Sequence, residues 1–285
     1  MILKENLFAV VVWYNPTDAN VLALSTYISQ VEQLIIVDNS DKDNAYLLED
    51  LPYSNVCYIP NYDNKGIAFA LNRGCEKAIE KGAEFVLTMD QDSRFPENGV
   101  ERYVELANQY PEPSLVGLFS PLHITTNIIP FTTGSYTERT AVMTSGNLLP
   151  LSIYKTMGGF AEELFIDLVD DEYCCRLHRA GYRIIQVNQA HLQHSLGDHT
   201  IQIRFLWFFK RIIHDHNPIR RYYIMRNSLE ILKRYPEQQV YYKKQIKKTI
   251  KRVVLYDNNR KCTKLRYMYW GWQDFRKGVF GKFAR

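Results

Sequence analysis

The triplet Asp90-Gln91-Asp92 offers the clearest chemistry in this chain of 285 residues. It follows the apolar run 85–89, and alternate residues of a strand share a face, so both carboxylates can point the same way. Two adjacent carboxylates stay ionised together only when a positive charge lies between them. A divalent cation such as Mg²⁺ or Mn²⁺ meets this need, and such an ion usually also binds a substrate phosphate. The triplet therefore predicts a metal site, with a solvated acidic loop as the alternative.

A second acidic group, Asp170-Asp171-Glu172, begins a predicted helix that ends at Gly181. Acidic residues in a first helical turn ordinarily complement the helix dipole. Three consecutive acids, with Asp167 shortly before them, exceed that need. We therefore expect at least one of them to be a general base whose pKa is raised by its neighbours. His191 and His194 follow on an alternating stretch, and spacing alone leaves open whether either histidine binds a metal.

Predicted strands and helices alternate in the part of the chain that carries the triplet. Apolar β-rich runs at 7–14, 34–37, 56–59 and 85–89 predict strands, as do 115–119 and 182–187. Helices are expected after Thr17-Asp18, where the apolar positions run from Val21 to Val31, and from Gly66 to Gly82. Residues 121–145 favour extended segments and a loop, followed by a short helix near Ser152. The alternation predicts an α/β fold with a mostly parallel sheet and right-handed crossovers.

In such a sheet, ligands bind beyond the carboxyl ends of the strands. This rule places Tyr14-Asn15, Asp38-Asn39 and the Asp90 triplet along one edge. The chain has no G-x-G-x-x-G after its first strand and no G-x-x-x-x-G-K-[ST] sequence. A dinucleotide-dependent dehydrogenase and a P-loop enzyme are therefore both disfavoured. A cation held by Asp90 and Asp92 is the expected means of neutralising phosphates.

The charge of the chain is divided unevenly. Residues 1–199 contain 13 Lys and Arg and 26 Asp and Glu, whereas residues 200–285 contain 22 Lys and Arg and 5 Asp and Glu. The net charge of the whole chain is +4. With 46% hydrophobic residues, the chain can form one large domain or one domain with an appendage. The five cysteines show no paired spacing, which indicates a reducing, intracellular compartment. We expect no secretory signal, and the apolar runs are too short to span a bilayer.

The basic region 200–285 is predicted to be helical, with helices at 201–213, 222–235 and 238–256. Within the last of these, residues 245–254 place apolar side chains three to four positions apart beside a basic face. That pattern suits an interfacial helix on anionic lipid, where each basic residue contributes about 1 kcal/mol. The alternative is that the many aromatic residues form a core or a homo-oligomer interface. No recognised nucleic-acid-binding motif is present, so nucleic acid is not expected as a partner.

These features together resemble the inverting glycosyltransferases of family 2, which have the GT-A fold. The resemblance covers about residues 7–230, and its motifs occur in the expected order. They are Tyr14-Asn15-Pro16, Val37-Asp38-Asn39-Ser40, Asn64-Lys65-Gly66-Ile67-Ala68, Asp90-Gln91-Asp92-Ser93, Ser145-Gly146-Asn147, the run 165–173 and His194-Ser195-Leu196-Gly197. The form Met-Asp-Gln-Asp-Ser, with Phe-Ile-Asp and Tyr-Ile-Met-Arg-Asn later, most resembles the rhamnosyltransferase branch. That branch uses dTDP-L-rhamnose to build bacterial cell-surface polysaccharide.

The resemblance implies roles for particular residues. Asp92 and His194 are expected to hold Mn²⁺ or Mg²⁺ on the donor diphosphate. Asp170 corresponds to the catalytic base, with Glu172 beside it; Asp171 fills a usually apolar position, so which of the three acts stays open. The residues expected to bind the donor nucleotide are Tyr14, Asn15, Asp38, Asn64, Gly66 and Asp90, with Asn72 as a weaker candidate. Those expected to contact the acceptor are Gly146, Asn147 and Arg226.

The implied reaction is transfer of L-rhamnose to a cell-surface polysaccharide or lipid-linked oligosaccharide. The cation stabilises the departing diphosphate, the acceptor hydroxyl attacks from the opposite face, and a carboxylate takes its proton. The implied organisation is a catalytic domain over 1–199, with halves at 1–95 and 96–199, and an extension over 200–285 on the inner face of the cell membrane. The alternatives are a UDP-galactose, UDP-glucose or UDP-galactofuranose donor, a non-catalytic sugar-nucleotide-binding module, and a nucleotidyltransferase. The last would need a basic cradle for a triphosphate near Tyr14, which the sequence does not offer.

Overall fold

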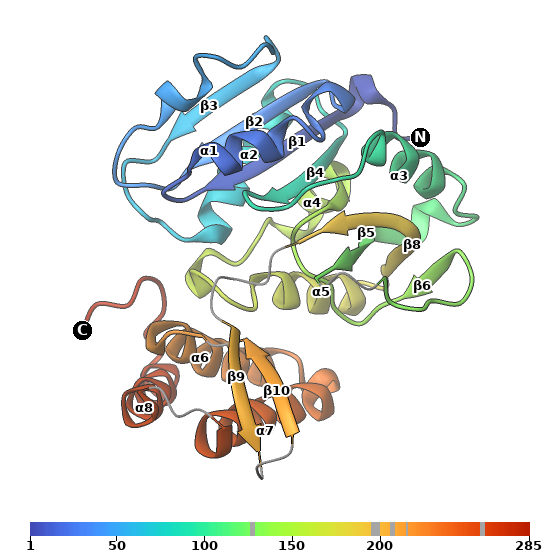
Figure 1. Cartoon of the computed structure of the whole chain (residues 1–285). Helices are drawn as coiled ribbons and strands as arrows, with labels where there is room; N and C mark the ends of the chain where they lie inside the picture. Colours follow the sequence, from blue (N-terminus) through green and yellow to red (C-terminus); the bar gives the residue numbers. More distant parts are fainter. Residues whose placement is uncertain (126–128, 195–199, 206–208, 215, 257–259) are drawn as a thin grey trace. The chain divides into compact units, whose positions relative to one another are not determined.

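The computed structural model describes residues 1–125, 129–194, 200–205, 209–214, 216–256 and 260–285 (Figure 1). These residues group into two compact units. The first contains residues 1–162 and 173–195, and the second contains residues 163–172 and 196–285. The predicted domain boundary at residue 199 and the motif residues 195–197 lie outside the described residues, and the division into halves at residue 95 stays a prediction.

Within the described residues, the first unit is built on an eight-stranded sheet. Its strands are β1 (Leu7–Trp13), β2 (Gln33–Asp38), β3 (Val56–Pro60), β4 (Phe85–Asp90), β5 (Val116–Ile124), β6 (Tyr136–Glu138), β7 (Asn147–Pro150) and β8 (Arg183–Gln193). They lie in the order β3-β2-β1-β4-β7-β5-β8-β6. The first four pair in parallel, as do β5 and β8, whereas β7 and β6 run antiparallel to their neighbours. The mostly parallel α/β sheet predicted from the sequence is therefore confirmed, and β6 and β7 are short strands that were not predicted.

The helices of this unit are α1 (Asp18–Leu24), α2 (Ile67–Glu80), α3 (Gly99–Asn108), α4 (Leu151–Met157) and the larger part of α5 (Val169–Arg179). Helix α2 packs on β1 and β2, and Gly74 permits the contact, because a Cβ there would lie 2.3 Å from Val10 Cγ1. Helix α1 ends at Leu24, earlier than its apolar spacing predicted, although Ile28 and Val31 remain buried. Helix α3 was not predicted at all.

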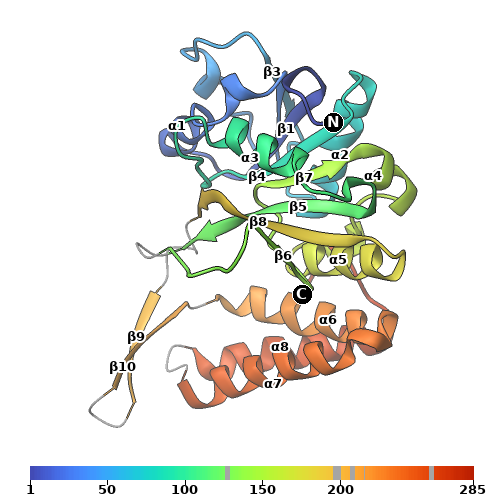
Figure 2. The ribbon, with the colours of Figure 1, turned by 90° about the vertical axis from the view of Figure 1, so that its right-hand side faces the viewer.

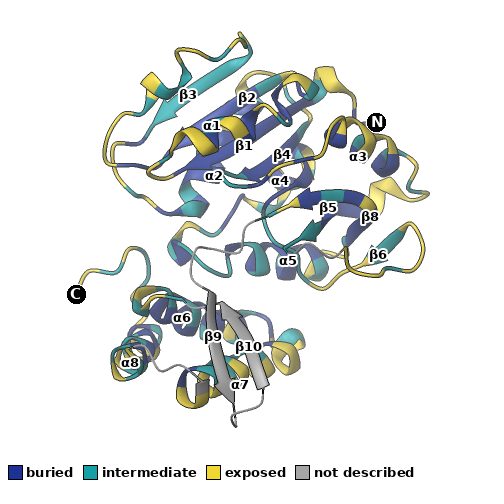
Figure 3. Ribbon diagram, in the orientation of Figure 1, coloured by how far each residue is buried: buried dark blue, intermediate teal, exposed yellow. Residues whose placement is uncertain are grey.

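Strand β1 lies in the interior of the sheet, between β2 and β4. All seven of its residues are at most 6% exposed (Figure 3). An unbroken apolar run is what a parallel strand requires when both faces of its sheet are covered. This run explains why the strand was predictable, and its burial makes the carboxyl ends of β1, β2 and β4 a rigid edge.

The second unit contains three packed helices, α6 (Pro218–Arg234), α7 (Gln239–Tyr256) and α8 (Lys261–Lys277) (Figure 2). Helices α6 and α8 approach closely at Gly271, where a Cβ would lie 2.5 Å from the Tyr222 carbonyl oxygen. An aromatic cluster joins these helices to the segment before α5; its members are Phe165, Tyr222, Tyr223, Tyr267, Trp270 and Phe283. The predicted C-terminal helices at 222–235 and 238–256 are confirmed, and α8 was not predicted. Among the described residues no helix is both long and apolar enough to cross a bilayer.

The predicted helix at 201–213 is wrong. Strands β9 (Thr200–Phe205) and β10 (Phe209–His214) occupy this part of the chain and pair antiparallel, with Thr200 opposite His214. The reason is visible in the sequence, because Ile201, Ile203 and Phe205 alternate with polar residues at a period of two. That period and the β-branched side chains favour a strand.

Candidate active site

The predicted edge forms where β1, β2 and β4 end. In the strand registers, Trp13 lies opposite Asp38, and Val12 lies opposite Asp90. We call residues 13–15, 38–40 and 90–93 the carboxyl edge. These three strand ends are adjacent, so the polar residues that follow them come together as expected.

The middle residue of the triplet connects two of these strand ends. Gln91 Oε1 accepts a hydrogen bond of 2.8 Å from the backbone N–H of Tyr14, and Gln91 Nε2 donates to the Tyr14 carbonyl at 3.3 Å. Asn15 has a left-handed backbone (φ 47°), and its N–H donates to Ser40 Oγ at 2.7 Å. The side chain of Tyr14 is 48% exposed. The backbone at Tyr14 and Asn15 is thus fixed while about half of Tyr14 is exposed, and the predicted contact of both residues with a nucleotide stays a prediction.

Asp38 is fully buried, and protein groups bond to both of its carboxylate oxygens. Oδ1 accepts from the Ser40 N–H at 2.9 Å, and Oδ2 accepts from the Tyr58 hydroxyl and from Asn44 Nδ2, both at 2.7 Å. Burial, together with the adjacent Asp38, raises the pKa of Tyr58, so its hydroxyl stays protonated and donates. The structure therefore shows Asp38 fixing the loop that follows β2; its predicted contact with a nucleotide stays a prediction.

Asn39 was part of a quoted motif but had no assigned role, and it organises the loop before α2. Its Oδ1 accepts from Asn61 Nδ2 at 2.9 Å and from the Lys65 N–H at 3.2 Å. Its Nδ2 donates to Asn64 Oδ1 at 3.2 Å and to the Gly66 carbonyl at 3.1 Å. Gly66 has φ 92° and immediately precedes α2. The two predicted nucleotide-binding residues Asn64 and Gly66 are thus held beside the end of β2.

Asn72, the weaker candidate, is buried within the first unit. Its Oδ1 accepts from the Tyr154 hydroxyl and the Phe160 N–H, both at 2.7 Å, and its Nδ2 donates to the Phe160 carbonyl at 3.0 Å and to Glu162 Oε1 at 2.8 Å. All the hydrogen-bonding positions of the amide are therefore used to join α2 to the segment after α4. This arrangement explains Asn72 as a structural residue.

Asp90, Asp92 and His194 come together at the carboxyl edge. One potential ligand atom from each lies within 4.8 Å of the others. His194 Nδ1 is 3.9 Å from Asp90 Oδ2 and 3.7 Å from Asp92 Oδ1. Two carboxylates and one imidazole fit a divalent cation, and the nitrogen ligand favours Mn²⁺ over Mg²⁺, which prefers oxygen ligands alone. The triplet itself predicted Asp90 as a metal ligand, whereas the family resemblance assigned Asp90 to the donor nucleotide; the structure makes it a potential metal ligand.

A chain of hydroxyls orients these groups, and the sequence did not reveal it. The Asp90 N–H donates to Ser145 Oγ at 3.0 Å, the Ser145 hydroxyl donates to Ser93 Oγ at 2.7 Å, and Ser93 Oγ lies 2.8 Å from His194 Nδ1. A hydroxyl oxygen has two lone pairs, so Ser93 Oγ can accept from His194 Nδ1–H as well as from Ser145, and the tautomer of His194 sets the direction of this contact. Such secondary contacts fix the ring of a metal-binding histidine. Ser93 and Ser145 both lie in the quoted motifs, which was the available signal.

His123 contacts Ser145, a member of this hydrogen-bond series, and is a further residue that the sequence did not single out. Its Nε2 donates to the Ser145 carbonyl at 2.7 Å, and its ring lies edge-on to His194 with centroids 6.1 Å apart. Burial, with a smaller contribution from the adjacent His194, lowers the pKa of His123 to about 4. His123 is therefore neutral at physiological pH and adds no positive charge that would compete with a cation.

Asn147 begins β7 beside β4, and Gly146 immediately precedes the strand; both residues were predicted to contact the acceptor. Gly146 has φ 80°, and a Cβ at this position would lie 2.6 Å from Pro121 Cγ. Both the conformation and the lack of space explain the glycine. Asn147 Nδ2 donates to the Met143 carbonyl at 2.8 Å, whereas its buried Oδ1 has no hydrogen-bond partner in the part of the chain that the structure describes.

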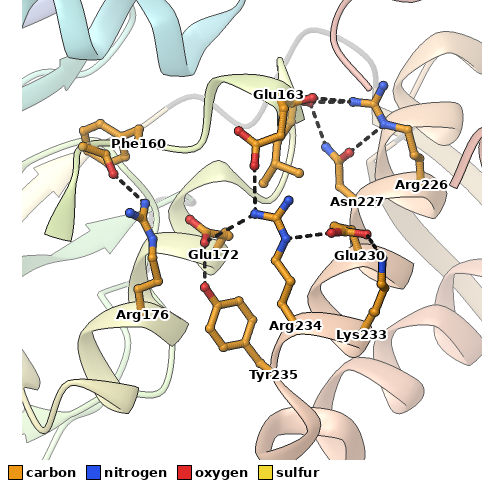
Figure 4. A network of polar contacts seen from close by, with 12 residues as sticks. Phe160, Glu163, Glu172, Arg176, Arg226, Asn227, Glu230, Lys233, Arg234 and Tyr235 are labelled. Carbon is orange, nitrogen blue, oxygen red and sulfur yellow. Dashed lines mark hydrogen bonds and ion pairs between the residues drawn. The ribbon is translucent and has the colours of Figure 1, made fainter. Parts of the chain in front are cut away.

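The three acids at the start of α5 belong to the second unit and differ in their surroundings. Glu172 is 2% exposed, and its Oε1 accepts from the Tyr235 hydroxyl at 2.6 Å (Figure 4). Asp171 Oδ1 accepts from the Tyr242 hydroxyl at 2.8 Å. Asp170 Oδ1 accepts from the backbone N–H of Asp171 at 3.0 Å. Two of the three acids are thus bonded by tyrosines of the C-terminal region, which the sequence did not indicate.

The pKa values of the first two acids are displaced in the direction expected for a general base. Burial raises the pKa of Asp170, and the neighbouring Asp167 raises it further. Burial, followed by the adjacent Asp170, raises the pKa of Asp171 to about 7. Two coupled carboxyl groups titrate as a pair, so near neutral pH this pair can bind or release a proton readily.

Arg226, the third predicted acceptor residue, is 0% exposed in the second unit. Its Nη1 donates to the Gly281 carbonyl and its Nη2 to the Leu164 carbonyl, both at 2.9 Å. It lies over the rings of Tyr222, Tyr223 and Phe280, at 5.0–5.3 Å from the centroids. The structure therefore gives Arg226 internal partners instead of a surface that an acceptor could contact.

A family model described as glycosyl transferase family 2 matches residues 15–121, which include the carboxyl edge from Asn15 onward. The chain belongs to the family 2 glycosyltransferases. It is 30% identical over 254 residues to the dTDP-rhamnosyl transferase RfbF of Shigella flexneri, an alignment that covers 81% of each chain. The predicted family is thereby confirmed.

Solved structures show the same fold at low sequence identity. The Staphylococcus aureus TarS 1–349 structure in complex with UDP-GlcNAc matches with a TM-score of 0.58 and 12% identity, covering 98% of this chain and 93% of that one. A structure of GalNAc-T7 with UDP, GalNAc and Mn²⁺ matches with a TM-score of 0.54 and 15% identity, covering 67% of this chain and 44% of that one. These similarities confirm the GT-A fold.

Proposed function

We propose that this protein transfers L-rhamnose from dTDP-L-rhamnose to a cell-surface polysaccharide or lipid-linked oligosaccharide, with inversion at the anomeric carbon. The observation that supports the donor is the 30% identity to a dTDP-rhamnosyl transferase over 81% of the chain. A nucleotide-sugar donor is also supported by the structural neighbours, whose structures contain UDP or UDP-GlcNAc. Tyr14, Asn15, Asn64 and Gly66 are the residues we assign to the nucleotide.

We assign a divalent cation, with Mn²⁺ preferred, to Asp90, Asp92 and His194. The two carboxylates and one imidazole available as ligands support this assignment, as does the Mn²⁺ present in the GalNAc-T7 structure. When bound, such an ion acts as a Lewis acid that stabilises the charge of the departing diphosphate. The protein's own contribution is to hold the three ligands in place through Gln91, Ser93 and Ser145.

We assign proton removal from the acceptor hydroxyl to Asp170. Tyr235 bonds Glu172, and Tyr242 bonds Asp171, whereas Asp170 accepts from the backbone at the first turn of α5. A raised pKa makes the Asp170 carboxylate a stronger base. Inversion takes place in one displacement, so one base is sufficient and no covalent nucleophile is required.

The donor assignment is tested by measuring nucleotide diphosphate release from dTDP-L-rhamnose, UDP-glucose, UDP-galactose and UDP-galactofuranose, with Mn²⁺ and a lipid-linked acceptor present. We expect dTDP-L-rhamnose to exceed each UDP-sugar by at least about a hundredfold in kcat/KM, because a site that hydrogen-bonds a particular base and sugar rejects analogues strongly. Faster turnover of a UDP-sugar would contradict the assignment of dTDP-L-rhamnose as the donor but would remain consistent with the proposed glycosyl transfer. Donor binding without turnover would favour a non-catalytic module.

We also propose that α7 brings the enzyme to an anionic membrane surface on the cytoplasmic side. The lysines of its solvent-facing side, all exposed, are Lys243, Lys244, Lys247, Lys248 and Lys251. Apolar residues accompany them, with Val240 80%, Leu255 54% and Val254 42% exposed. Basic and apolar groups together on one helix favour the headgroup region of an anionic bilayer.

Replacing Lys243, Lys247 and Lys251 with glutamine is expected to weaken binding to phosphatidylglycerol vesicles about a hundredfold, at about 1 kcal/mol for each charge. Vesicle co-sedimentation measures this affinity. The matched control replaces the exposed lysines Lys4, Lys42 and Lys81 of the first unit with glutamine, which removes the same charge and should leave binding nearly unchanged. Equal binding of both triple variants, or equal binding to phosphatidylcholine vesicles, would contradict the proposal.

A further inference from the structure

The segment that leads into α5 has an unusual backbone. Phe165, Asp167 and Leu168 have φ values of 66°, 65° and 63°. Residues with side chains rarely adopt this left-handed region, and several close together persist only where the surroundings fix them. Asp170 lies two residues after Leu168. Whatever fixes the segment therefore also fixes the position of Asp170.

The side chain of Asn227, which is 0% exposed, supplies much of this restraint. Its Nδ2 lies 3.0 Å from the Leu164 carbonyl oxygen, 2.9 Å from that of Ile166 and 2.8 Å from that of Asp167. Its Oδ1 accepts from Arg226 Nε at 3.0 Å, which orients the amide so that the Nδ2 hydrogens face the carbonyls. One amide on α6 thus contacts three backbone carbonyls of the irregular segment.

Arg226 and Arg220 add to the same restraint from the same helix. Arg226 Nη2 donates to the Leu164 carbonyl at 2.9 Å and to the Glu163 carbonyl at 3.3 Å (Figure 4). Arg220 Nε donates to Asp167 Oδ2 at 2.7 Å, and its Nη2 donates to Oδ1 at 2.5 Å. Three side chains of α6 therefore bond four backbone carbonyls and one carboxylate of the segment between residues 163 and 167.

The choice of partners distinguishes this arrangement from ordinary core packing. A buried guanidinium and a buried amide are costly unless every donor is satisfied, and an apolar helix face could have packed on the segment without them. Here Arg226 Nη1, Arg226 Nη2 and Asn227 Nδ2 donate to backbone carbonyls, so they fix the course of the chain. The carboxylates of Asp170, Asp171 and Glu172 are left to other partners.

We propose that Asn227, supported by Arg226, is a positioning residue that sets the conformation of the segment carrying Asp170. This inference rests on the proposed role of Asp170 as the base. Arg226 and Asn227 of α6 then act in catalysis by positioning Asp170, and neither residue needs to contact the donor or the acceptor. This inference also replaces the predicted acceptor contact of Arg226 with an indirect one.

The decisive variant is Asn227→Ala. We expect kcat to fall about a hundredfold, because a displacement of about 1 Å at a reacting group costs that much. The KM for the donor and the affinity for dTDP should change less than about threefold, because the carboxyl edge lies in the first unit and makes no hydrogen bond to Asn227 among the contacts described. Asn227→Asp keeps the shape but places an oxygen against three carbonyls, so its loss should be at least as large.

Rates are expressed per dTDP-binding site, so that unfolded molecules do not count. Ser228→Ala, a buried neighbour on α6, is the control and should leave kcat unchanged. Arg220→Ala provides a variant that should fold even if the Asn227 variants do not, because the Arg220 side chain is 39% exposed. It should lower kcat about tenfold through the loss of its two bonds to Asp167.

If the Asn227→Ala variant folds and keeps its kcat per site, the positioning role is overturned. If the Asn227 variants do not fold, an unchanged kcat per site in Arg220→Ala overturns it. Asp170→Asn is measured in parallel to separate the two proposals. If Asp170→Asn is inactive while Asn227→Ala turns over normally, the positioning role fails and the base assignment stands. If Asp170→Asn retains activity, the base assignment fails, and the positioning inference fails with it.

Discussion

Asp170→Asn is expected to lower kcat at least about a thousandfold while dTDP binding stays unchanged. A general base contributes about 10²–10⁴ in rate, and the two neighbouring acids are poorly placed to replace it. Glu172 is buried against Tyr235, and Asp171 is bonded to Tyr242. The measurement is nucleotide diphosphate release under saturating donor, with dTDP affinity determined separately by calorimetry.

The other two acids supply the controls for this prediction. Asp171→Asn keeps the size of the side chain and can still accept from Tyr242, so its kcat should fall by less than about tenfold. A larger loss in Asp171→Asn than in Asp170→Asn would assign the base to Asp171 instead. For the wild-type enzyme, kcat should decline as the pH falls through the titration of the Asp170–Asp171 pair, because the base acts as a carboxylate. Loss of activity on the alkaline side alone would argue against either acid.

Asp92→Asn, or removal of divalent ions by chelation, is expected to reduce turnover about a thousandfold. A Lewis acid at the departing diphosphate supplies several kcal/mol of transition-state stabilisation, and Asp92 is one of the three side chains that can bind the cation. Mn²⁺ added back after chelation should restore the wild-type rate more fully than Mg²⁺, because of the imidazole ligand. Steady-state turnover against metal concentration measures both effects.

The exposed residue Asp50 provides the matched control for Asp92. Asp50→Asn removes the same charge from the first unit and should leave both turnover and metal dependence unchanged. Full activity of the wild-type enzyme in excess chelator would show that transfer does not need the ion. In that case the three residues at the carboxyl edge would have to act on the diphosphate in another way.

The sequence was most informative where a local pattern determines the structure. The apolar run of β1 could only be a doubly covered strand, and the polar residues after β1, β2 and β4 therefore had to meet at one edge. Asp92 and His194, which are about a hundred residues apart, came together through the family resemblance rather than through any local pattern. The pairing of β5 with β8, which brings His194 to this edge, depends on contacts that no window of sequence reveals.

The errors have equally physical causes. The segment 201–213 was assigned to a helix because of its position in a basic, helical region, although its period of two favoured strands. Arg226 was assigned to the acceptor by the family resemblance, and that contact stays a prediction; the burial of its side chain depends on the carbonyls of Glu163, Leu164 and Gly281, which no local pattern indicates. The left-handed residues at 165–168 carry no glycine, so the signal that normally marks such a conformation was missing.

The grouping of residues 163–172 with the C-terminal helices has a consequence for building chimeras of this family. A chimera that exchanged residues 200–285 alone would place the helices of a relative against the native segment 163–172. The Arg-Asn pair of the introduced helix would then meet backbone carbonyls whose positions it does not match. The unit that can be exchanged is discontinuous, comprising residues 163–172 together with 196–285. Grafts between relatives should therefore carry both pieces, and natural variation in the two pieces should be inherited as one block.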